Sequence, residues 1–139
     1  MTLNNTSIRK APTQELYDWF YTQLTAQGWN VHSALPQEDT PDMYPFVVIG
    51  QAMQTLGGTK TSLNGSIALD IDVWGSAEQR LTVGGMGDTI LRNVIGSIET
   101  SSYNFYANPN EQLLTVSSDT SVPNKVYQRC ALNLTIQIN

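Results

Sequence analysis

The feature that most constrains the fold is a strictly alternating stretch, SIALDIDVWG, at residues 66–75. A period of two is the pattern of a β-strand that rests one face on a core. The aliphatic residues at the odd positions 67–73 share that face, and Asp70, Asp72 and Trp74 lie on the opposite one. The chain is therefore expected to build a sheet with one strongly apolar side.

Other stretches extend this sheet. The last one, 125–138, alternates over many residues and places Cys130 inward, as a small buried apolar residue, and Arg129 outward. Weaker strand patterns cover 29–35 and 103–118, the latter with a turn at 108–110.

A further strand over about 46–54 begins with the unbroken apolar run Phe46 to Ile49. A half-exposed strand would alternate, so this run is expected to be buried on both sides of the sheet. No predicted element remains to cover the second side, which favours a neighbouring subunit as its cover.

Two helices complete the pattern. Leu16, Trp19, Phe20 and Leu24 have the spacing of one helical face and predict a helix over 13–27. A second helix is expected over about 77–98. Its three glycines between 84 and 87 each cost ~1 kcal/mol in a helix interior, so it is expected to begin late, near 88, or to bend.

The predicted fold class is α+β, with a mainly antiparallel sheet of about five strands and two helices packed on one face. The length of 139 residues suits a single domain, over 12–139, after a flexible polar leader at 1–11. A stretch rich in Gly, Thr and Ser, 55–65, predicts a flexible hairpin tip.

Composition excludes several classes of function. A net charge of −5 argues against a duplex-DNA binder, which needs a basic surface. No apolar run approaches the ~18–20 residues of a membrane span, and the first residues lack the apolar segment of a secretory signal. A single cysteine precludes an intrachain disulfide and, with a single histidine, a zinc ligand set.

The short glycine motifs do not make a cofactor site. GGTKT at 57–61 lacks the second glycine of a phosphate loop, and GGMGD at 84–88 lacks the third glycine of a dinucleotide fingerprint. His32 has no nucleophile elbow to accompany it and is expected at the surface or an interface. We therefore expect no metal, no cofactor and no enzyme activity.

Asp70 and Asp72 form the sharpest chemical pattern. Residues two apart on a strand lie ~6.5–7 Å from each other, a spacing that could suit the paired acids of a glycoside hydrolase or a divalent cation. The alternative is a strand surface facing solvent or a neighbouring subunit, with Arg129 or another base nearby.

The order of these segments resembles a known family. YPFVVIG at 44–50, then Lys60, then SIALDIDVWGS, then a helix ending in ILRNVIGSI and a long last strand resemble the tail completion proteins of long-tailed bacteriophages. These include the tail-to-head joining proteins and, more loosely, the tail terminators of lambda-like phages. The resemblance covers about 14–138, and neither the leader nor the tract 104–110 belongs to it.

The resemblance implies a structural virion protein, assembled in the host cytoplasm, without catalysis. Such proteins form a homo-oligomeric ring, a hexamer, on the head-proximal end of the tail tube. The ring ends polymerisation of the tube protein and meets the head connector, and DNA passes through its channel without specific binding. The candidate subunit-interface residues are Phe46, Val48, Lys60, Asp70, Asp72, Trp74 and Arg129.

Alternatives remain open at the level of the sequence. One is another neck or head-completion protein, or the equivalent cap of a phage-derived contractile device, which shares the ring architecture. Another, from a different class, is a small hydrolase that uses Asp70 and Asp72.

Overall fold

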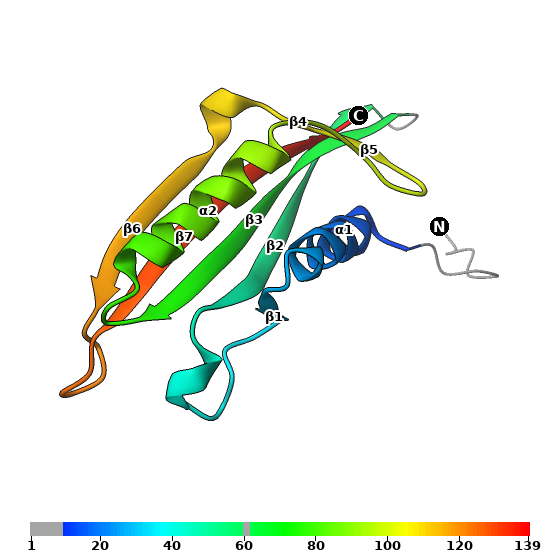
Figure 1. The fold of residues 1–139 in the computed structure, drawn as a ribbon. Coiled ribbons are helices and arrows are strands. Elements are labelled where there is room, and N and C mark those ends of the chain that lie inside the picture. Colours follow the sequence, from blue (N-terminus) through cyan, green and yellow to red (C-terminus); the bar gives the residue numbers. More distant parts are fainter. Residues whose placement is uncertain (1–9, 60–61) are drawn as a thin grey trace.

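The computed structural model describes the backbone of residues 10–59 and 62–139. It describes the side chains of the same ranges except those of 58–64. Its elements in chain order are α1 (Pro12–Ala26), β1 (Asn30–His32), η1 (Pro41–Met43), β2 (Phe46–Thr59), β3 (Ser62–Ser76), α2 (Arg80–Val94), β4 (Gly96–Glu99), β5 (Asn104–Ala107), η2 (Pro109–Glu111), β6 (Leu113–Asp119) and β7 (Tyr127–Ile138). The fold is α+β, as expected (Figure 1). No helix in these ranges is long and apolar enough to cross a membrane.

The sheet is curled and mixed rather than simply antiparallel. Its strands follow the order β1-β2-β3-β7-β5-β4. Strand β6 also pairs with β7, along residues 127–133, whereas β5 pairs with residues 137 and 138. Strand β1 runs parallel to β2, and every other pair of neighbouring strands in the described part of the chain is antiparallel. The expectation of about five strands is too low, because β4 lies in the predicted end of the second helix and 103–118 splits into β5 and β6.

Both helices pack on the same face of the sheet, as expected (Figure 1). Leu16 and Phe20 of α1 and Ile90 of α2 belong to one buried cluster with Val47 of β2 and Ile71 of β3. Pro12 occupies the first turn of α1, where its missing N–H costs nothing. The helix ends just before Gly28, whose φ of +83° suits glycine.

The second helix differs from its prediction. It begins at Arg80, includes all three glycines and ends at Val94. Gly87 is needed because a Cβ there would lie 2.2 Å from Sγ of Cys130 on β7. The lost helix propensity is thus offset by a close approach between helix and sheet, which no local pattern reveals. Cys130 is buried, as expected.

The long hairpin of β2 and β3 also differs from expectation. The predicted flexible tip at 55–65 is strand up to Thr59 and again from Ser62, with Thr59 opposite Ser62. Strand β7 accompanies β3 only as far as Gly65, which lies opposite Ile138. The end of the hairpin therefore runs past the last residues of β7, and residues 60–61 lie outside the described range.

Candidate functional site

The face of the sheet opposite the helices is called here the open face. Val47, Ile49, Ile71 and Val73 belong to the helix-side core, so the residues that alternate with them point to the open face. Cross-strand pairing arranges the open-face residues in rows, in which Trp74 stands between Phe46 and Arg129, Asp72 between Val48 and Ala131, and Asp70 opposite Asn133. Six of the seven candidate interface residues thus lie on this one face, and the seventh, Lys60, lies outside the described residues.

Arg129 joins two of the candidates. Its Nε lies 3.2 Å from Oδ1 of Asp72, and its Nη2 lies 3.1 Å from Oδ2. The guanidinium carbon also lies 5.3 Å from the centre of the Trp74 ring, a cation–π distance. The predicted alternative of Arg129 beside the two acids is therefore confirmed for Asp72.

Asp70 is exposed and accepts a hydrogen bond of 2.8 Å from Nδ2 of Asn133. Each of the two carboxylates is thus bonded to a different side chain of β7. Within the described ranges, no three His, Cys, Asp or Glu side chains are grouped so that they could hold a metal ion. The bonds to Arg129 and Asn133 give both carboxylates a structural role on the sheet surface.

Phe46 and Val48 are covered by the chain itself. They are 2% and 7% exposed, although the sequence predicts no element to cover their side of the sheet. Strand β1 is shorter than predicted, and residues 33–45 form a loop, the β1–β2 loop, that returns over the end of the open face. The rings of His32 and Tyr44 lie 5.6 and 5.1 Å from that of Phe46. The expectation that no element was left to cover this end is therefore wrong for Phe46, and both residues offer little surface to a neighbour.

Asp39 fastens the β1–β2 loop. Its carboxylate accepts hydrogen bonds from the hydroxyls of Tyr44, at 2.8 Å, and of Tyr127, and Nζ of Lys125 lies 3.3 Å away. The hydrogen bonds from Tyr127 and Tyr44 hold the pKa of Asp39 below its ordinary value. Burial, and then the bond to Asp39, raises the pKa of Tyr44 well above that of a free tyrosine.

Sequence reasoning missed this network. Asp39 lies 86 and 88 residues from Lys125 and Tyr127 in the chain, and neither partner belongs to a motif. The only local signal was the cluster of acids and prolines in 36–45, which predicts a loop but not the surface on which the loop rests.

Trp74 carries the one polar side-chain atom that is buried without a hydrogen-bond partner in the described part of the chain, its indole Nε1. Such an unsatisfied donor costs ~1–3 kcal/mol. Trp74 lies at the end of the open face that the β1–β2 loop crosses. This end therefore combines covered aromatic rings with an N–H donor that has no hydrogen-bond partner.

The rest of the open face is exposed. Met53 is 56% exposed opposite Ala68, which is exposed as well. Further along the same hairpin Leu56 is 67% exposed, but it has the parity of Ala52 and so lies on the helix side of the hairpin rather than on the open face. Comparison of the chain with protein-family models, with curated proteins and with solved structures finds no match.

Proposed function

We propose that the chain is a structural virion protein that forms a ring, a hexamer, on the head-proximal end of a bacteriophage tail tube. The ring ends polymerisation of the tube protein and joins the tail to the head connector, and DNA passes through it unbound. The location and the number six rest on the sequence resemblance. The inference that the chain forms an oligomer rests on the exposed surface of the sheet.

The observation that carries the proposal is the open face. Both helices pack on the other side of the sheet, so Met53, Ala68 and Asp70 remain exposed across β2 and β3. Neighbouring exposed apolar side chains are suited to be covered by a partner, with charged residues at the rim of the contact. A ring needs such a surface in addition to the subunit's own core, and each subunit meets its neighbour head to tail.

The projecting hairpin supports the same proposal. Strands β2 and β3 continue beyond the end of β7, and Leu56 near their end is exposed. A two-stranded ribbon of this kind gains little from its own core, because it has no third strand to pack on. It is suited to lie against a neighbouring subunit or the tube.

The hydrolase alternative is less well supported. Asp72 is held by Arg129 and Asp70 by Asn133, which gives both carboxylates a role in the sheet surface. Replacing both with Asn tests the alternative. Loss of a hydrolytic activity that the parent protein shows would favour the enzyme and overturn the structural assignment.

The test of the ring is electron microscopy of the purified protein, alone and mixed with tail tubes that lack it. The expected result is a six-fold ring on one end of the tube. Asp70→Arg reverses an exposed charge on the open face and is expected to prevent ring formation while leaving the fold intact. Glu99→Arg, on β4, is the matched control and is expected to leave the ring unchanged. Tubes that stay uncapped by the parent protein would contradict the proposal.

A further inference from the structure

A pocket of about 230 Å³ lies where the β1–β2 loop meets the loop between β6 and β7, at the end of the open face. Its aromatic wall is made of Tyr44, Phe46, Trp74 and Tyr127. The ring of Tyr44 lies 5.7 Å from that of Tyr127, stacked, and 5.1 Å from that of Phe46, so three of the four rings adjoin one another.

Three carboxylates accompany this wall: Glu38, Asp39 and Asp119. Among the described residues that line the pocket there is no Lys, Arg or His. Asp39 is paired with Lys125 outside the lining, and Asp119 accepts a hydrogen bond from the backbone N–H of Ser121. Glu38 is exposed. The pocket is thus acidic as well as aromatic, and complementary to a cation.

Aromatic faces attract cations, and nearby carboxylates add their own Coulomb attraction. The chain already uses this attraction next to the pocket, where Arg129 lies over the ring of Trp74 while it is paired with Asp72. The pocket offers the same combination of ring faces and acids to a group from outside.

The rim of the pocket indicates the source of that cation. Leu35, on one loop, is 60% exposed and Val122, on the other, is 43% exposed. Apolar residues on both sides of a pocket are best covered by a protein surface. The volume is also below the ~300–1,000 Å³ of typical small-molecule sites, and suits one side chain rather than a whole ligand.

We propose that this pocket receives an arginine side chain from a partner protein, with apolar residues of the partner resting on Leu35 and Val122. The aliphatic stem of an arginine packs against an aromatic wall, and its planar guanidinium reaches carboxylates with several donors. This assignment stands on the pocket alone and does not depend on the ring.

The test uses the full chain and an acetylated, amidated Leu-Arg-Leu tripeptide, followed by NMR at the indole N–H of Trp74. The reporter is assigned by comparison with Trp74→Phe. The matched peptide carries citrulline, which has the shape of arginine without its charge, and free arginine is the third probe. Peptide binding is expected to shift the Trp74 signal. The citrulline peptide is expected to bind about tenfold more weakly, equivalent to ~1.4 kcal/mol.

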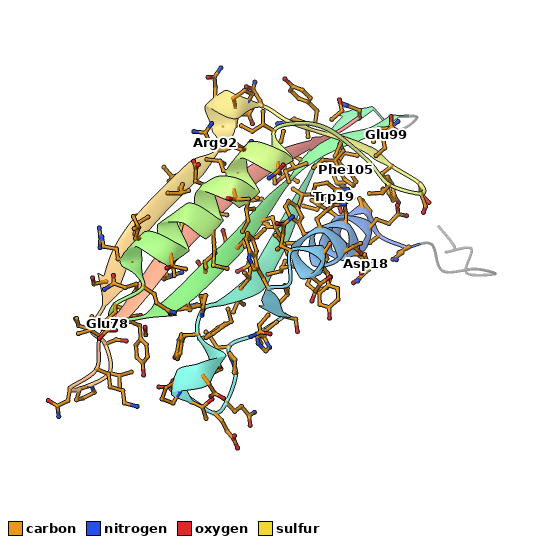
Figure 2. The ribbon with its side chains drawn as sticks, viewed as in Figure 1. Asp18, Trp19, Glu78, Arg92, Glu99 and Phe105 are labelled. Atoms are coloured by element: carbon orange, nitrogen blue, oxygen red, sulfur yellow. The ribbon has the colours of Figure 1, made fainter. Side chains whose placement is uncertain are left out.

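The double variant Glu38→Gln with Asp119→Asn is expected to weaken binding of the arginine peptide to a similar degree. Glu38 lies on the β1–β2 loop and Asp119 is the last residue of β6, so the fold is expected to persist, which the unchanged signals of the other two tryptophans would show. Glu99→Gln is the control, because Glu99 lies at the opposite end of the molecule from the β1–β2 loop (Figure 2). It is expected to bind like the parent.

Equal binding of the arginine and citrulline peptides, or no shift of the Trp74 signal by either, would overturn the proposal. Free arginine that binds as tightly as the peptide would overturn the protein partner, because the rim would then contribute nothing.

Discussion

The guanidinium of Arg129 makes two contacts of 3.1 and 3.2 Å to the carboxylate of Asp72, from the neighbouring strand and on the uncovered face of the sheet. In the sequence Asp72 looked like one half of a paired-acid site. In the structure Arg129 neutralises its charge, and the pair is part of the sheet surface. It also places the cation beside Trp74, so that strand β3 and strand β7 are joined by charge and by aromatic contact at one point.

The pair is expected to contribute little to the stability of the isolated chain. The side chains of Arg129 and Asp72 are 41% and 21% exposed, and ion pairs with such solvent access contribute ~0–1 kcal/mol. A double-mutant cycle with Arg129→Met and Asp72→Asn in urea denaturation measures this. A coupling free energy above about 3 kcal/mol would indicate a desolvated pair instead.

The apolar run at the start of β2 is expected to tolerate no charge. Val48 is 7% exposed and stands opposite Asp72, so Val48→Asp buries a carboxylate next to another one. The expected loss in the free energy of unfolding is about 3–5 kcal/mol or complete unfolding. The control is Met53→Asp on the same strand, where the side chain is 56% exposed. A Val48→Asp protein that melts like the parent would refute the buried position.

The glycines of α2 are expected to respond in opposite directions. At Gly87 a Cβ meets Sγ of Cys130 at 2.2 Å, so Gly87→Ala should destabilise by ~1–3 kcal/mol. At Gly85 no atom lies within 4 Å of the added Cβ, and Gly85→Ala should stabilise by up to ~1 kcal/mol through helix propensity. Cys130→Ala should recover part of the loss at position 87. Thermal unfolding checks all three, and equal effects at 85 and 87 would contradict the close contact.

Periodic elements of this fold could be predicted from the sequence. The alternation in 66–75 gives β3, the alternation in 125–138 gives β7, and the i, i+3, i+4, i+8 spacing gives α1, because each buries one face against the same core. The shared face of the two helices followed from the same patterns.

The parts that could not be predicted depend on contacts between distant residues. Gly87 lies in α2 where a side chain would meet Cys130 of β7, whereas glycine by itself predicts a break in the helix. The loop that covers Phe46 is bonded through Asp39 to Lys125 and Tyr127, which are distant in the sequence. The sequence pattern was therefore enough to propose the open face as an interface. It could not show that the β1–β2 loop already covers the apolar end of that face.

The β1–β2 loop is expected to be held over a middle range of pH. The pKa of Asp39 is lowered in the folded chain, so its contribution is complete above the unfolded value of ~3.9 and is lost as pH falls through the lower folded value. The pKa of Tyr44 is raised, so its contribution is complete below ~10 and is lost as pH rises through the higher folded value. Hydrogen exchange of residues 33–45 against pH checks this.

Asp39→Asn removes the charge from this network and is expected to loosen the loop at neutral pH. It should also lower the pKa of Tyr44, measured from tyrosinate absorbance with Tyr44→Phe as the reference, although burial keeps that pKa above the ordinary value. Unchanged exchange of 33–45 in Asp39→Asn would show that packing on Phe46 alone holds the loop.

The role at the tail end is tested in a phage that carries a stop codon early in this reading frame, with tail lengths and head joining measured by electron microscopy. We expect tails of variable and excessive length that fail to join heads, and restoration of normal length and of head joining by the parent protein supplied from a plasmid. Tails of normal length that join heads normally in the absence of the protein would contradict this role.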